Sequence, residues 1–321
     1  MLYLFILLLI IIILVSYIGA KDIPQKYLEF EPLHSRLLGM REEPYDDTRP
    51  EFTKIILKSG QRKLLFNEIE FYTYAKKTWS PLGRKFIVIY AGAAEGYHSD
   101  IIMELFPDFY FEYYDPRDFY KKLYKYKNLK IHQQFFKRED ALKLYIKYQD
   151  RNKYFVLFLS DIRLGTEEEY IMPDMDNQRE WCDCIKPDYA MLKFRLPWSS
   201  GRTEYYAGDI YTQPRIGPTS TEMRLWTNCK NRIIYDNQSY NDRCFYWNIH
   251  NRLAHHKIPK VYIKAIQGLC YCYDCWSEID IMKKLFADTK QQINLMNTIG
   301  KRFPINIEPH NIYNKNKILN K

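Results

Sequence analysis

The sequence predicts an α/β fold with a mostly parallel β-sheet and helices on both of its faces. Short apolar runs at residues 85–90 and 154–160 lack polar alternation, which is the pattern of strands buried on both faces. Segments with apolar residues at helical spacing separate such runs, and strands that alternate with helices form parallel sheets. The chain has 321 residues, of which 46% are apolar, so it is long enough to bury a large core and is not disordered throughout.

The first twenty residues differ from the rest of the chain. Residues 1–20 carry no charge, and the Leu, Ile, Val and Phe run within them is long enough to cross a hydrocarbon layer of about 30 Å. No basic segment precedes the run, and Ile18 stands where a signal peptidase needs a small residue. We expect an uncleaved transmembrane anchor, with a cleaved signal as the alternative. The basic residues that follow favour a membrane-anchored protein whose domain faces the cytoplasm.

The remaining elements follow in order along the chain. Residues 21–58 contain four prolines and little periodicity, which indicates an arm or linker. Apolar periodicity predicts helices at residues 63–77, 98–105, 138–148, 179–185 and 246–255. Apolar runs predict strands at residues 85–90, 109–114, 129–132, 154–160, 189–194 and 223–227. We assign residues 59–275 to one domain and residues 276–321 to a C-terminal helix and basic tail.

The overall charge and the aromatic content suit a polyanionic partner. The net charge is +9, and 17% of the residues are aromatic, so cationic and stacking side chains are both abundant. Between residues 281 and 321, eight basic residues stand against two acidic ones, which places much of the charge near the C-terminus. AT-rich coding is an equally good explanation of the aromatic content.

The seven cysteines form no even disulfide framework and indicate a reducing compartment. Cys270, Cys272 and Cys275 stand close enough in sequence to hold zinc with Cys244 or a histidine. Buried reduced thiols are the simpler interpretation, and we expect no metal.

Two features at the ends of expected strands indicate a ribose-containing cofactor. Gly92, Ala94 and Gly96 follow the first strand, where small side chains let a ligand approach the backbone amides. Asp115 follows the next strand about twenty residues later and could accept hydrogen bonds from a ribose diol. Together they favour either a dinucleotide or S-adenosylmethionine.

A third feature adds acid and base groups at the same edge of the sheet. Asp161 ends a strand, Lys193 lies inside an apolar strand, and Glu222 precedes another. A lysine buried there needs a carboxylate partner or loses its proton, because an unpaired buried ammonium is costly. With Lys63 nearby, such a lysine could take a proton from a sugar hydroxyl, although a buried ion pair is the simpler alternative.

These residues also carry a family resemblance. The order Lys63, Asp161, Lys193, Glu222 resembles the Lys-Asp-Lys-Glu tetrad of RNA ribose 2′-O-methyltransferases. The closer likeness is to the poxvirus-type cap-specific mRNA (nucleoside-2′-O-)methyltransferase and poly(A) polymerase regulatory (small) subunit family. It is carried by QRKLL at 61–65, VIYAGAAEGYH at 88–98, YDPR at 114–117, LSDIR at 159–163, LKFRLP at 192–197 and STEMRL at 220–225.

The resemblance implies a Rossmann-like S-adenosylmethionine-dependent methyltransferase fold and an enzyme of viral mRNA capping. The implied acceptor is the first transcribed nucleotide of capped mRNA, with Lys193 as base and with Lys63, Asp161 and Glu222 beside it. The implied S-adenosylmethionine residues are Gly92, Ala94, Gly96, His98, Asp115, Arg117, Phe135, Phe136 and Asp161. The implied partners are capped mRNA and a poly(A) polymerase catalytic subunit, besides the membrane at residues 1–20, and the implied location is a viral factory or virion.

The resemblance also implies that Trp198 and Tyr45 stack on the cap base. The chain departs from the family at four positions. Glu95 replaces a proline of the glycine loop, Thr219 replaces an aromatic residue, and Ser200 and Asn241 stand where acids are expected. The alternatives are a non-catalytic RNA-binding processivity subunit of a poly(A) polymerase, and a structural component that only inherits the fold.

Overall fold

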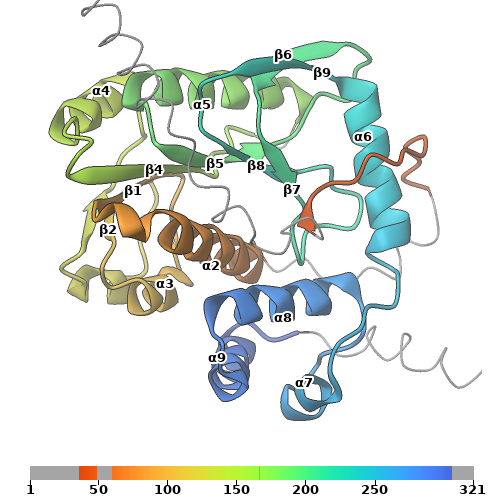
Figure 1. Cartoon of the computed structure of the whole chain (residues 1–321). Coiled ribbons are helices and arrows are strands. Elements are labelled where there is room, and N and C mark those ends of the chain that lie inside the picture. The colour runs from red at the N-terminus through yellow and green to blue at the C-terminus, as the bar shows by residue number, and fades with distance from the viewer. Residues whose placement is uncertain (1–35, 49–59, 166, 306–321) are drawn as a thin grey trace, which may run out of the picture. The chain divides into compact units, whose positions relative to one another are not determined.

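A seven-stranded sheet forms the centre of the protein in a computed structural model, which describes residues 36–48, 60–165 and 167–305 (Figure 1). In spatial order, its strands are β3 (Leu129–His132), β2 (Tyr110–Tyr114), β1 (Lys85–Ala91), β4 (Tyr154–Ser160), β5 (Tyr189–Phe194), β8 (Met223–Thr227) and β7 (Asp209–Tyr211). The strands from β3 to β5 run parallel, whereas β8 and β7 are antiparallel to their neighbours. The predicted Rossmann-like α/β fold with a mostly parallel sheet is confirmed.

Helices cover both faces of this sheet (Figure 1). One face carries α2 (Gly60–Trp79) and α3 (Ser99–Leu105), and the other carries α4 (Arg138–Lys147) and α5 (Ile171–Ile185). This arrangement explains why β1 and β4 are apolar without alternation, since all but their first residues are buried.

The chain after β5 adds smaller elements around this core. A two-stranded antiparallel ribbon consists of β6 (Arg202–Tyr206) and β9 (Arg232–Asp236). The helices beyond it are α6 (Asn237–Tyr246), α7 (Lys260–Ala265), α8 (Tyr273–Leu285) and α9 (Thr289–Arg302). Single helical turns lie at Ser80–Leu82, Lys121–Lys125, Glu168–Tyr170 and Trp247–Asn251, the last of them a π-turn.

Two predicted helices differ from the structure. The helix expected at residues 246–255 is instead α6, which begins nine residues earlier because the Asp236 carboxylate caps it by accepting a hydrogen bond from the Ser239 amide at 2.9 Å. The helix expected at residues 179–185 begins at Ile171, with Pro173 in its first turn, where proline costs no hydrogen bond.

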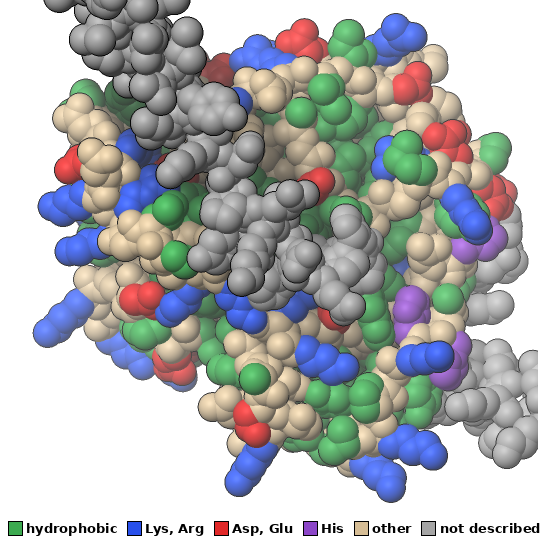
Figure 2. Space-filling view, in the orientation of Figure 1, with side chains coloured by type: hydrophobic (Ala, Val, Ile, Leu, Met, Phe, Trp, Pro, Cys, Tyr) green, Lys and Arg blue, Asp and Glu red, His purple; other side chains and the backbone are tan. Residues whose placement is uncertain are grey.

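The aromatic side chains are used largely in packing. Trp226 on β8 is buried and stacks on Tyr211 of β7, with ring centroids 4.0 Å apart, and it meets Phe71 of α2 edge-on. Lys and Arg side chains are spread over the face seen in Figure 2, with Asp and Glu among them. On this face the excess positive charge therefore does not gather in a single patch.

The transmembrane assignment and the membrane-anchored localisation need correction. Across residues 36–48, 60–165 and 167–305, no helix is both long and apolar enough to cross a membrane. The physical reason is charge: α2, the longest helix among the described residues, has 20 residues and carries Arg62, Lys63, Glu68 and Glu70 within its first eleven. Residues 1–20, on which the prediction was based, lie outside the described residues, as does most of the arm at 21–58.

Candidate functional site

The carboxyl ends of the parallel strands lie level with one another. Ala91 at the end of β1 pairs with Tyr114 at the end of β2 and with Ser160 at the end of β4. The Gly92 amide donates to the Tyr114 carbonyl at 2.9 Å, and the Asp161 amide donates to the Ala91 carbonyl at 3.0 Å. The residues that follow these strands are therefore brought to one edge of the sheet, where α/β proteins bind ligands.

The four residues of the predicted tetrad meet at this edge. Lys63 of α2 lies 2.7 Å from the Glu222 carboxylate, measured from Nζ to Oε1. Lys193 of β5 lies 3.2 Å from Asp161 and 3.6 Å from Glu222. All four side chains are at most 16% exposed, so the contacts are largely shielded from solvent. We call these residues the Lys-Asp-Lys-Glu cluster.

Two arginines join the cluster, and the sequence analysis did not identify either as a site residue. Arg224 on β8 is buried and donates to Asp161 at 2.8 Å, and Arg163 donates to Glu222 at 2.5 Å. Gln213 links Glu222 to Arg224. Its side-chain amide nitrogen donates to the Glu222 main-chain carbonyl at 2.9 Å, and its amide oxygen accepts from Arg224 at 2.8 Å. The available signal was an arginine inside the apolar strand MRLWT, which needs an acidic partner just as Lys193 does.

Four cationic side chains thus face two carboxylates. Burial opposes ionisation of Asp161, but the charges of Lys193 and Arg224 outweigh it and lower its pKa to about 2. Burial also disfavours the charged form of Glu222, yet Lys193, Lys63 and Arg224 hold its pKa well below the usual range. Burial, assisted by Arg224 and Lys193, lowers the pKa of Lys63 even though Glu222 acts in the opposite direction. Both acids therefore stay ionised, while burial and the neighbouring cations disfavour the charged form of Lys63.

A cavity of about 580 Å³ opens beside the cluster, beyond the ends of β1, β2 and β4. Its lining is mainly aromatic and apolar, with a few polar groups, as is usual for sites that bind small molecules. Six of the residues predicted to bind the cofactor line it: Gly92, Asp115, Arg117, Phe135, Phe136 and Asp161. Asp161 therefore belongs both to the cavity and to the Lys-Asp-Lys-Glu cluster.

The other three predicted cofactor residues are absent from this lining. The Ala94 amide donates to Asp115 at 3.2 Å, and its carbonyl accepts from Arg117 at 2.6 Å, so Ala94 shapes the wall through its backbone. A side chain at Gly96 would meet Leu123 and Ser99, which makes this glycine a packing residue. The ring of His98 is buried between Gln61 and Glu68 of α2, 2.7 Å from each. These contacts hold the loop onto α2.

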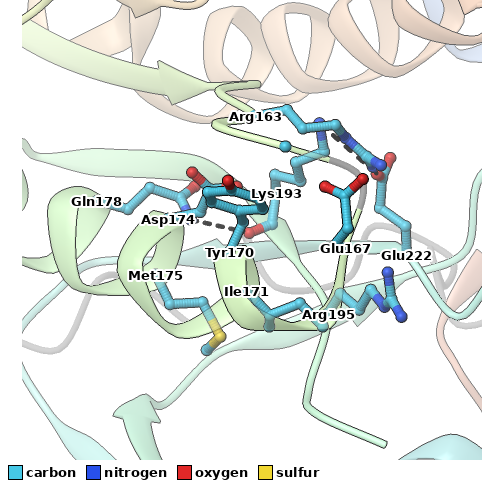
Figure 3. A pocket seen from close by; sticks show the side chains of 11 residues that line it. Arg163, Glu167, Tyr170, Ile171, Asp174, Met175, Gln178, Lys193, Arg195 and Glu222 are labelled. Carbon is cyan, nitrogen blue, oxygen red and sulfur yellow. Dashed lines mark hydrogen bonds and ion pairs between the residues drawn. The ribbon is translucent and has the colours of Figure 1, made fainter.

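A second, smaller cavity is lined by Lys193 and Glu222 of the cluster (Figure 3). Its volume is about 30 Å³, which is room for about one water molecule. Figure 3 shows Arg163 reaching Glu222 with Lys193 beside them, while Tyr170, Asp174 and Gln178 line the opposite wall. The Gln178 amide donates to the Lys193 carbonyl at 3.1 Å and so fixes the backbone that carries this lysine.

Trp198 and Tyr45 lie together, but not as two parallel plates. Their ring centroids are 4.3 Å apart at an interplanar angle of 61°, which leaves no room for a base between them. The Tyr45 hydroxyl donates to the Thr219 carbonyl at 2.8 Å, and both aromatic residues line a cavity of about 640 Å³.

The acidic residues near Tyr45 and Trp198 do not lie at the positions where the family pattern has acids, which are Ser200 and Asn241 in this chain. Asn241 is buried, and its side-chain amide donates to the Pro197 and Asn237 carbonyls, so it has a structural role. Asp46 and Asp47 line the cavity with Tyr45 and Trp198. We missed them, and the signal was their position directly after Tyr45 in the chain.

The fold and the site define a class of protein: a Rossmann-like α/β protein with a cavity beyond the strand ends and a cluster of lysine and acid side chains beside it. A family model described as "Poly A polymerase regulatory subunit" matches residues 23–297. The chain belongs to this family, which confirms the resemblance seen in the sequence.

Other comparisons add little about function. A search of curated proteins finds no significant match. Among the solved structures that match is one described as "The structure of bluetongue virus VP4 reveals a multifunctional RNA-capping production-line". It is 13% identical, with a TM-score of 0.43, and the match covers 68% of this chain and 33% of that chain. A likeness at this level carries no functional argument.

Proposed function

We propose that the protein is an S-adenosylmethionine-dependent RNA ribose 2′-O-methyltransferase that acts on the first transcribed nucleotide of capped mRNA. The proposal rests on one observation: Asp161 both lines the 580 Å³ cavity and lies 3.2 Å from Lys193. A ligand in the cavity and a base on Lys193 would therefore be neighbours.

The residues around the cavity fit the proposed cofactor. Tyr114, Phe136 and Trp181 offer aromatic surface for an adenine, and Asp115 offers a carboxylate for a ribose diol. Both Asp115 oxygens already accept hydrogen bonds from Arg117, at 3.0 Å each. The Arg117 side chain is 60% exposed, so a ligand carboxylate could reach it and, by competing for its donors, release Asp115. When bound, S-adenosylmethionine would supply a methyl group carried on a sulfonium.

The cluster residues then have distinct roles in the proposal. Lys193, in its neutral form, would accept the proton of the ribose 2′-hydroxyl at Nζ. This would prepare that oxygen to receive the methyl group that bound S-adenosylmethionine supplies, with S-adenosylhomocysteine as the other product. Asp161 and Glu222 orient Nζ through contacts of 3.2 and 3.6 Å. Lys63 and Arg224 help to keep both acids ionised.

Cap recognition by Trp198 and Tyr45 is a further part of the proposal. A 7-methylguanine base is cationic, so it favours an aromatic face together with nearby carboxylates. Asp46 and Asp47 provide those carboxylates in the same cavity. Because the two rings are in edge contact, Tyr45 would have to move for a base to stack between it and Trp198.

Methyl transfer by the full chain tests the proposal. Labelled S-adenosylmethionine and capped RNA are incubated with the protein, and label in the RNA is counted. We expect transfer by the unmutated chain and a loss of about a hundredfold or more for Lys193→Arg, because arginine keeps the charge but cannot act as a base. Lys143→Ala, an exposed lysine on α4, serves as the matched control and should transfer normally. The proposal would be refuted if the unmutated chain transferred no label to the RNA and also showed no binding of S-adenosylmethionine in calorimetry.

The family match favours a second role as the regulatory subunit of a poly(A) polymerase. Such a subunit binds RNA and a catalytic partner without needing the Lys-Asp-Lys-Glu cluster. If both roles exist, Lys193→Arg should abolish methyl transfer and leave stimulation of polyadenylation unchanged. A chain that stimulates polyadenylation but neither binds S-adenosylmethionine nor transfers a methyl group would have the second role alone.

A further inference from the structure

Three cysteines lie together at the start of α8. Cys270 and Cys272 precede the helix, and Cys275 lies in its first turn. All three are buried, and their Sγ atoms lie within 4.8 Å of one another. Buried cysteines often serve as small apolar side chains, so burial alone does not define a site.

The spacing of the sulfur atoms is that of metal ligands. Cys270 Sγ and Cys275 Sγ are 3.8 Å apart. Tetrahedral zinc with Zn–S bonds of about 2.3 Å holds its sulfur ligands about 3.8 Å apart, whereas the sulfurs of a disulfide are about 2.05 Å apart. The observed separation fits a shared ion and not a covalent bond.

Hydrogen-bond donors are directed at the same sulfur atoms. The Cys270 amide donates to Cys275 Sγ and the Cys272 amide donates to Cys270 Sγ, each at 3.4 Å. The Arg215 guanidinium also donates to Cys275 Sγ, at 3.3 Å. Such donors can stay in place when the sulfur atoms bind a metal, because a metal-bound thiolate still accepts hydrogen bonds from the residues around it. These contacts distinguish the three cysteines from ordinary buried thiols.

We infer that Cys270, Cys272 and Cys275 bind a zinc ion. Each thiol gives its proton to solvent as its sulfur binds the ion, so three thiolates supply three of the four ligands of a tetrahedral site. Cys244 is outside the group of ligand atoms found among the described residues, as is every described histidine. We assign the fourth position to water or a small anion.

The ion would stabilise the packing of α8 against α2, the helix that carries Lys63 of the candidate site. Glu278 of α8 is buried and accepts hydrogen bonds from Arg62 of α2 at 2.6 Å and from Arg215 at 3.0 Å. Because α2 also carries Lys63, an ion that fixes the start of α8 supports the helix pair without touching substrate. The inference does not depend on methyl transfer.

Metal analysis of the full chain tests the inference. The protein is purified with a thiol reductant and without chelator, and its zinc content is measured by mass spectrometry. We expect about one zinc per chain, with loss of most of it in Cys272→Ser and in Cys275→Ser. Cys184→Ser, a half-buried cysteine on α5, serves as the matched control and should keep the zinc.

A cobalt titration keeps the test valid if a variant fails to fold. The unmutated chain is stripped of metal and titrated with Co²⁺, which should produce a thiolate-to-cobalt charge-transfer band that zinc then removes. A chain that contains no zinc and gives no such band would overturn the inference. A folded Cys275→Ser variant that retains its full zinc content would also overturn it.

Discussion

Glu222 is the residue on which the positive charges of the site converge. Its two carboxylate oxygens contact Lys63, Arg163 and Lys193 at 2.7, 2.5 and 3.6 Å, and its side chain is 5% exposed. A buried acid in such contacts is costly to remove, because its partners then stay buried without compensation.

Glu222→Gln should therefore destabilise the fold as well as stop the proposed reaction. We expect a loss of about 3 kcal/mol in the free energy of unfolding, measured by urea denaturation near neutral pH. Glu204→Gln on β6 is the matched control, since Glu204 is 58% exposed and should change stability by less than about 0.5 kcal/mol. Equal stability of the two variants would show that the cluster contributes nothing to the fold.

Gly92 is the second residue that the site requires. Its φ is +84°, and an added Cβ would lie 2.9 Å from backbone atoms of both Asp161 and Ile162. Gly92→Ala should cost on the order of 2 kcal/mol in thermal or urea unfolding and weaken binding of S-adenosylmethionine. Gly39→Ala has no heavy atom within 4 Å of the added Cβ and is the control. If both variants match the unmutated chain in stability and in binding of S-adenosylmethionine, then neither property depends on the close approach of Gly92 to Asp161.

The sequence was most informative about site residues where a charged residue interrupts an apolar strand. Lys193 was predicted for this reason and Asp161 because it ends a strand, and the structure brings the two together. Arg224 satisfies the same condition but was missed, because the resemblance directed attention to the four tetrad positions. Asp46 and Asp47 were missed because only folding of the arm onto the region of Trp198 brings them near it.

Among the elements, β2 illustrates how a buried acid connects the sheet to a helix. Glu112 of β2 is buried, and it accepts hydrogen bonds from His132 of β3 at 2.6 Å, from Tyr148 after α4 at 2.6 Å, and from Lys147. Burial alone would raise the pKa of Glu112, but these hydrogen bonds lower it to about 2. Ionised Glu112 thus ties the edge of the sheet to α4.

This low pKa predicts how stability depends on pH. The pKa of Glu112 is lower in the folded chain than its usual value of 4.5, so its contribution is complete above about pH 4.5 and is lost as the pH falls toward 2. Glu112→Gln should cost on the order of 2 kcal/mol near neutral pH, and the difference from the unmutated chain should shrink below about pH 4.5. Urea unfolding at a series of pH values measures this. The exposed Glu139→Gln should show little difference at any pH. A Glu112→Gln difference that stays constant down to pH 3 would contradict the assignment.

Three of the four strands whose bounds the sequence predicted, β4, β5 and β8, are largely buried, whereas β3 has no buried residue. The expected strands at residues 129–132, 154–160, 189–194 and 223–227 match β3, β4, β5 and β8 in both bounds. The ribbon of β6 and β9 and the short strand β7 were not predicted, since their residues are polar or few and their pairing is set by distant parts of the chain. The start of α6 was missed because a cap at Asp236, and not apolar periodicity, defines it.

In the whole molecule, one edge of the sheet collects the features that bear on function. The glycine loop after β1, the acids after β2 and β4, and the lysine of β5 meet there because parallel strands end on the same side. The family match covers residues 23–297 and so includes all of these elements. Fold and family were accessible from the sequence, whereas the relative placement of the cavities and the arginines depends on side-chain packing that no local pattern records.

The most direct test of the central claim is methyl transfer to three capped RNAs that differ only at the 2′ position of the first transcribed nucleotide. One carries a hydroxyl, one a methoxy group and one a hydrogen. The full chain should label the first RNA from S-adenosylmethionine and leave the other two unlabelled. Equal labelling of all three would contradict the claim, because the methyl group would then be going to another atom.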